Sequence, residues 1–146
     1  MARLRILTLS SLFPNPEMPY HGAFVAERLR HLVASGEVET RVIAPVPWFP
    51  AKHPLFGRYA RFACVPSVSI WQGTTVLHPR HLVIPRSGWY ATPLLMAFAV
   101  RAAVRRVQRE GWDFQAIDAH YYYPDGVAAA LWALLVFDAF LGRVTR

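Results

Sequence analysis

Two short segments carry the residue types best suited to chemistry. In the first, His120 follows Ala-Ile-Asp-Ala and precedes three tyrosines and a Pro-Asp-Gly turn. A neutral imidazole can hydrogen-bond a sugar hydroxyl, and a protonated imidazole can stabilise a phosphate. The tyrosines could line a pocket and stack on a ring, or they could pack between a helix and a sheet. Asp125, within the turn, is predicted to cap the next helix rather than to act in catalysis.

The second segment is centred on Gly22, which stands where an amphipathic helix is expected to begin. A residue without a Cβ there would let an anion approach the free N–H groups of the first turn, an approach that the helix dipole favours. The alternative is that Gly22 only allows the chain to turn. The sequence contains neither a GxGxxG nor a Walker pattern, so Gly22 by itself is a weak signal.

The remaining candidates give little evidence for metal or nucleophilic chemistry. His78 and His81 flank an arginine, but the sequence offers no evident third ligand, so no metal is predicted. Cys64 is the single cysteine, which rules out an internal disulfide, and it is expected to be a buried thiol in a reducing compartment. No Ser-His-Asp or Cys-His spacing and no pair of carboxylates stands out, and no cofactor is predicted.

Basic residues outnumber acidic ones, at 16 against 9, which favours anionic partners. Arg101, Arg105 and Arg109 form an i, i+4, i+8 row on a predicted helix, with Arg106 beside it. This row is either a solvated helix face or a strip that rests on anionic lipid. A nucleic-acid partner is not expected, because the basic residues are spread along the chain and are not interleaved with aromatic residues in a known motif.

Periodicity predicts the elements that must position these residues. Residues 4–10 read as a strand, 11–21 as a proline-rich loop, 22–36 as a helix ended by glycine, and 40–44 as a second strand. Strand, helix and strand in this order form a βαβ unit with parallel strands. The apolar stripe of the helix consists of Val25, Leu29, Leu32 and Val33.

The rest of the chain continues the same architecture. Residues 45–62 are expected to be a loop with a short helical turn, and 74–85 to hold short extended pieces limited by prolines to an edge or a strand end. A helix is predicted over 92–110, with Pro93 in its first turn and an apolar face formed by Met96, Val100, Ala103 and Val107. A strand over 114–120 and a helix over 125–141 follow. The apolar run 127–142 is too short for a membrane span, which needs about 18 residues or more.

This order predicts an α/β fold, a parallel sheet with helices on both faces, as one half of an open doubly wound sheet. Such sheets bind ligands outside the carboxyl ends of their strands. The loops 10–22 and 120–126 are therefore expected to face each other. At 146 residues the chain is long enough for one domain.

Several segments together resemble the N-terminal half of retaining glycosyltransferases of family 4, which have the two-domain glycosyltransferase B fold. The segments are "RILTLSSLFPNPEMPYHGAFVAERLRHL", "VIAPVPWFP", "HPRHLVIP", "GWYATPLL" and "WDFQAIDAHYYYPDGVAAALWA". They cover roughly residues 3 to 133. The combination of "DAHYYYPDG" after a strand with "HGAFV" at a helix start is the most specific part.

The resemblance implies a role for each candidate residue. Gly22 would lie near the phosphates of a nucleotide-sugar donor, and His120, the catalytic candidate, would reach the donor sugar. The N-terminal domain mainly serves the sugar or lipid-linked acceptor, and the acceptor-side candidates are Tyr121, Tyr122, Asp125, Arg80 and Arg86. The fold would be Rossmann-like and the location cytoplasmic, at or near the inner face of the membrane.

The chain also departs from the family. In the family, the residues after about 133 continue with another buried strand and then a whole nucleotide-sugar-binding domain that holds a basic pair and a Glu-x7-Glu motif. Residues 1–146 are therefore expected to be a partial N-terminal domain, inactive alone, from a truncation, a frameshift or an excision. The alternative function is a non-enzymatic basic α/β module that binds an anionic membrane surface or another anionic partner.

Overall fold

The structure is a computed structural model that describes residues 3–48, 57–83 and 88–134. Its elements follow in the order β1 (Leu4–Leu9), α1 (Ala23–Ala34), β2 (Val38–Ile43), β3 (Val46–Trp48), α2 (Arg58–Phe62), β4 (Val68–Trp71), β5 (Thr74–Leu77), β6 (Arg80–Leu82), α3 (Gly88–Arg109) and β7 (Ala116–Ala119). An irregular turn, η2 (Tyr122–Gly126), then leads into helical residues 127–134.

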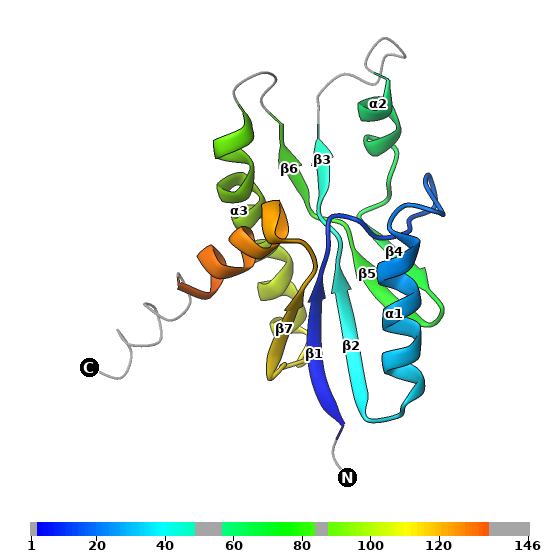
Figure 1. Ribbon diagram of the computed structural model, residues 1–146. Helices are drawn as coiled ribbons and strands as arrows, with labels where there is room; N and C mark the ends of the chain where they lie inside the picture. Colours follow the sequence, from blue (N-terminus) through cyan, green and yellow to red (C-terminus); the bar gives the residue numbers. More distant parts are fainter. Residues whose placement is uncertain (1–2, 49–56, 84–87, 135–146) are drawn as a thin grey trace, which may run out of the picture.

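The main sheet has five strands in the order β4-β5-β2-β1-β7 (Figure 1). β1 pairs in parallel with β2, as the βαβ pattern predicted, and also with β7. β2 pairs in parallel with β5, which lies inside the sheet rather than at the edge expected for residues 74–85. The prediction of an all-parallel sheet is wrong at one edge, where β4 runs antiparallel to β5. The fold is thus α/β with a mixed sheet.

The antiparallel edge exists because β4 and β5 are joined by a tight hairpin. Gln72 and Gly73 form its turn, and both have positive φ, at 46° and 81°. Positive φ at both central residues is the geometry of the type I′ turn, whose twist matches that of the flanking strands. Neither β4 nor this turn was predicted from the sequence.

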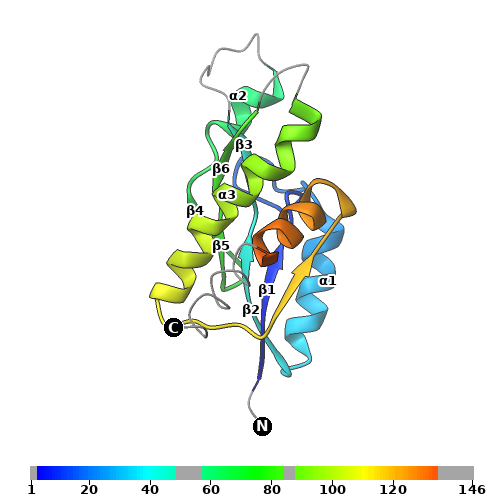
Figure 2. The same cartoon turned by 90° about the vertical axis from the view of Figure 1, so that its left-hand side faces the viewer.

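The two faces of the sheet carry separate apolar clusters, because side chains alternate along each strand. Leu7, Leu9 and Ile43 pack with residues of α3 and with Trp132 on one face. Val42 and Val76 pack with residues of α1 on the other face. Figures 1 and 2 accordingly show α1 and α3 on opposite sides of the sheet, which confirms the prediction of helices on both faces.

The helix stripes were predicted better than the helix ends. Val25 and Leu29 of α1 are fully buried, whereas Val33 is 37% exposed at the edge of the stripe. Four residues of the apolar face predicted for α3 are buried: Met96, Val100, Ala103 and Val107. α3 begins at Gly88, however, so Pro93 lies beyond its first turn.

β3 and β6 form a short parallel pair that extends the direction of β2 and β5. β3 falls in a segment that was expected to be a loop because of its prolines. Pro47 is tolerated there because, among the described strands, β3 pairs with β6 alone, so one side of the strand needs no donor. The short helix α2 matches the predicted helical turn.

Within the described residues, no helix is long and apolar enough to cross a membrane.

Candidate functional site

The connections of the sheet create one place where a ligand site is expected. The chain runs from β1 to β2 and on to β5 in one direction, and then returns to place β7 on the other side of β1. The carboxyl ends of β1 and β7 therefore flank a topological switch point, the usual ligand position in open α/β sheets. The loops that leave these two ends are 10–22 and 120–126.

Three polar side chains meet beside this switch point. Asp118 and His120 lie on the α1 face of the sheet at the end of β7, and the His120 backbone N–H donates to Leu9 O at 2.9 Å, which extends the β1·β7 ladder. Arg28 reaches them from α1 and donates through Nη1 to Asp118 Oδ2 at 2.6 Å. This cluster joins residues 90 positions apart in the sequence.

The cluster fixes the imidazole of His120. Its Nε2 lies 3.0 Å from Arg28 Nη1 and 3.2 Å from Asp118 Oδ2. Nε2 can accept from the guanidinium when the ring is neutral with its proton on Nδ1, or donate to the carboxylate when it carries a proton itself. The side chain of His120 is 15% exposed and that of Arg28 is 55% exposed, so the guanidinium is the solvent-facing member.

Gly22 is explained by packing. It has φ +64° at the N-cap of α1, and a Cβ at this position would lie 2.1 Å from Leu12 O and 2.4 Å from Leu12 C. Only a residue without a side chain fits against the main chain there. No side chain caps the first turn of α1. The role of Gly22 in binding donor phosphates stays a prediction.

Asp125 ties the two loops together. Its Oδ2 accepts from the backbone N–H and the hydroxyl of Ser11, at 2.8 and 3.1 Å, so the predicted meeting of the loops after β1 and β7 is confirmed. The predicted helix cap is not formed, because the carboxylate points to Ser11 instead. Asp125 is completely buried, and its Oδ1 has no hydrogen-bond partner among the described residues.

Burial is also the main influence on the ionisation of this carboxyl. Loss of hydration raises the pKa of Asp125 to about 6, and the two hydrogen bonds from Ser11 only partly offset this rise. A buried carboxyl with a perturbed pKa beside a switch point is a feature that functional sites often share, although structural networks show it as well.

The tyrosines after His120 take different positions because the chain turns there. Tyr121 adopts a positive φ of 75°, and its ring lies edge-on to Phe24 of α1 at a centroid distance of 6.1 Å. Tyr122 is 96% exposed, whereas Tyr123 is partly buried before a cis proline. Tyr121, Tyr122 and Phe24 thus give aromatic surface close to the polar cluster.

Of the two arginine candidates, Arg80 does not join this site. Arg80 donates through Nη2 to the carbonyls of Ala63 and Val65, at 3.3 and 3.1 Å, and so fixes the chain between α2 and β4. Arg86 lies outside the described residues. Cys64 is exposed and free rather than buried as expected.

The two histidines of the HPRH segment are both buried, and His78 is held by hydrogen bonds, whereas Nδ1 of His81 has no hydrogen-bond partner among the described residues. His78 contacts Ala44 O through Nδ1 and Ser69 Oγ through Nε2, and burial lowers its pKa although the bond to Ala44 opposes this. Burial lowers the pKa of His81 to about 4. Among the described residues, no group of three or more potential ligands could hold a metal ion.

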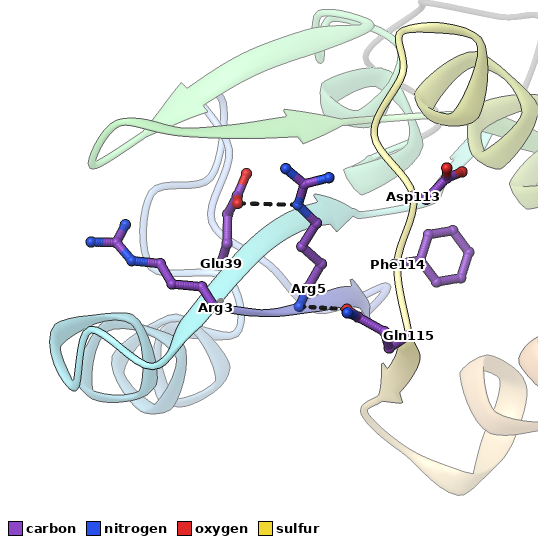
Figure 3. Close-up of a pocket in the computed structure, with 6 residues that line it drawn as sticks. All are labelled: Arg3, Arg5, Glu39, Asp113, Phe114 and Gln115. Carbon is purple, nitrogen blue, oxygen red and sulfur yellow. Dashed lines mark hydrogen bonds and ion pairs between the residues drawn. The ribbon is translucent and has the colours of Figure 1, made fainter. Parts of the chain in front are cut away.

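Three cavities lined by described residues lie elsewhere. The largest of these, about 520 Å³, lies at the amino-terminal edge of the sheet, opposite the end of β7 that carries His120. Figure 3 shows Arg5 bonded to Glu39 and Gln115 along its wall. Two arginines and two carboxylates balance its charge, so it has no clear preference for an anion. The other two are lined by residues of the loop after β1 with β4, and of β5 with α3.

Sequence reasoning found His120 but missed Arg28 and Asp118. Arg28 falls in the helix predicted over 22–36 but outside its apolar stripe, and Asp118 falls inside the strand predicted over 114–120. The usable signal was spacing along the strand, since a residue two positions before His120 must lie on the same face. The partner on α1 could be found only once the helix was known to cover that face.

No protein-family model, curated protein or solved structure is significantly similar to the chain. The resemblance to family 4 glycosyltransferases therefore rests on the sequence segments alone.

Proposed function

We propose that the chain is the acceptor-side part of a retaining glycosyltransferase with a Rossmann-like arrangement of its sheet. The observation that carries the proposal is the Arg28–Asp118–His120 cluster beside the switch point between β1 and β7. The position matches the expectation for His120, and the two loops named by the family resemblance are joined there through Ser11 and Asp125.

The chemistry of the cluster suits a sugar. An imidazole, a carboxylate and a guanidinium together offer both donors and acceptors to the hydroxyl groups of a hexose. The exposed rings of Tyr121 and Phe24 add apolar surface for the faces of a sugar ring. Ligand sites commonly combine a few placed polar groups with aromatic walls in this way.

In the proposed reaction, this chain contacts the sugars and a second, nucleotide-binding part of the enzyme stabilises the diphosphate. The bond between the anomeric carbon and the donor diphosphate breaks, and the oxygen of the acceptor hydroxyl bonds to that carbon on the same face. The hydroxyl proton passes to the leaving diphosphate. His120 contacts the donor sugar, and Tyr121 and Tyr122 face the acceptor. Stabilisation of the leaving diphosphate contributes most to the rate, and a nucleotide-binding part of the enzyme would supply most of it. A cytoplasmic location is part of the proposal, and a single exposed free cysteine suits a reducing compartment.

Saturation-transfer NMR of the chain with a panel of nucleotide sugars and free sugars tests the proposal. We expect millimolar binding of at least one sugar, with transfer to the protons of the sugar ring. His120→Ala should abolish this signal, whereas His31→Ala, a change at an exposed histidine on α1, should leave it intact. Absence of sugar binding in the folded protein, or equal loss in both variants, would contradict the proposal.

A second function, a binding module for an anionic surface, is favoured by a separate observation on α3, and it does not require the cluster around His120.

A further inference from the structure

One exposed face of α3 combines apolar and basic side chains. Residues spaced by three or four positions share a face of a helix. Such spacing places six residues in one line along α3, which we call the α3 stripe: Tyr90, Leu94, Phe98, Arg101, Arg105 and Arg109. The opposite side of the helix packs on the sheet through residues such as Met96 and Val104.

The first half of the α3 stripe is apolar and exposed. Tyr90 is 90% exposed, Leu94 is 48% exposed and Phe98 is 54% exposed. A single exposed apolar residue needs no explanation, but three on consecutive turns of one helix face form a patch of the kind that marks interaction sites.

The second half of the α3 stripe is positively charged and is not neutralised. α3 contains no aspartate or glutamate. Glu110, which follows it, pairs with Arg106 and Arg41. Among the residues that the structure describes, no carboxylate lies within ion-pair distance of Arg101, Arg105 or Arg109. Three guanidinium groups on one face therefore remain available to an anionic surface.

We propose that the α3 stripe docks the protein on the surface of an anionic lipid bilayer. Interfacial helices place Trp, Phe and Leu at the level of the headgroups and acyl chains, while Lys and Arg contact the lipid phosphates. An acidic protein or a nucleic acid would leave the apolar half without a matching partner, and a purely apolar partner would leave the arginines unpaired. α3 lies on the membrane rather than across it, because no described helix can span a bilayer.

This orientation leaves the candidate site open. α3 and α1 cover opposite faces of the sheet, and the Arg28–Asp118–His120 cluster lies on the α1 side (Figure 2). The apolar half of the α3 stripe lies at the end of the molecule where β1 and β7 finish (Figure 1).

Flotation with vesicles tests the docking surface. The chain is mixed with vesicles of phosphatidylcholine alone or of phosphatidylcholine with phosphatidylglycerol, and the bound fraction is measured at low and high salt. We expect binding to the mixed vesicles only, with a steep loss at high salt, because salt shortens the range of charge interactions. Arg101→Gln, Arg105→Gln and Arg109→Gln should each lower the partition coefficient about fivefold.

Matched control variants distinguish binding through the α3 stripe from binding that depends only on the overall charge or hydrophobicity of the protein. Leu94→Ser and Phe98→Ser should reduce binding to the mixed vesicles at least as much as an arginine variant does. Arg61→Gln, at an exposed arginine on α2, and Ile70→Ser, at a 67% exposed position on β4, should leave binding unchanged. Circular dichroism and melting curves confirm that every variant is folded.

Two results would overturn the proposal. Equal losses in the stripe variants and the control variants would show that binding depends on net charge alone. A dimer in light scattering that Leu94→Ser dissociates, without any binding to mixed vesicles, would assign the α3 stripe to a second copy of the chain.

Discussion

Replacing Gly22 with alanine tests whether backbone packing explains this glycine, and Gly36 provides a matched control. Both residues have positive φ, at 64° and 76°. A Cβ at Gly36 would meet nothing within 4 Å, whereas a Cβ at Gly22 would lie 2.1 Å from Leu12 O. The two alanine variants thus share the cost of a left-handed backbone and differ only in the collision.

The magnitudes follow from this difference. Gly36→Ala should lower the free energy of unfolding by about 1–2 kcal/mol, the cost of a left-handed L-residue. Gly22→Ala should cost roughly 1–3 kcal/mol more, because main-chain atoms of Leu12 must move to admit the methyl group. Urea unfolding followed by tryptophan fluorescence measures both values. Equal losses in the two variants would show that the loop after β1 yields without cost and that packing does not explain Gly22.

Three further changes have defined outcomes. The pKa of Asp125 is about 6 in the folded protein, against an ordinary value of 3.8 for an unburied carboxyl. The folded state therefore binds this proton more tightly than the unfolded state does. The proton adds fully to the free energy of unfolding below pH 3.8, and this contribution is lost as the pH rises through about 6. Asp125→Asn should therefore gain up to about 3 kcal/mol relative to the parent between pH 4 and pH 7 in denaturant titrations, and a constant difference would disprove this. Gln72→Asn should raise the free energy of unfolding by up to about 1 kcal/mol, and with it the denaturation midpoint, because asparagine tolerates a positive φ in a type I′ turn. A lower midpoint would contradict the turn geometry. Leu29→Ala should cost about 2–5 kcal/mol, whereas Val33→Ala, at a 37% exposed position of the same helix, should cost much less, and a reversed order would mean that the buried face of α1 is misplaced.

The sequence was most informative where one physical requirement decided the local structure. The buried faces of α1 and α3 followed from the 3.6-residue spacing of Val25 and Leu29 and of Met96 and Val100. The parallel pairing of β1 with β2 followed from the helix between them. These predictions succeeded because burial of one face leaves a helix or a parallel strand few alternatives.

Other features depended on contacts that local patterns do not encode. The β4–β5 hairpin was missed because glutamine is an unusual residue at positive φ, so the Gln72–Gly73 turn carried a weak signal. The partner of His120 on α1, Arg28, was missed because only the completed fold brings the two side chains together. Asp125 was assigned to a nearby helix end because a bond to Ser11, 114 residues away, leaves no trace in spacing.

The order of strands has a consequence for synthesis on the ribosome. β1 lies between β2 and β7, and β2 follows it closely in the chain, but β7 begins only at Ala116. A nascent chain can pair β1 with β2 early and must then leave the other edge of β1 open while residues 44–115 are translated. At about 5–20 residues per second this takes several seconds. During that time the hydrogen-bonding edge of Leu4–Leu9 is exposed to other strands, so a chaperone that shields nascent edges would protect this protein most before β7 emerges.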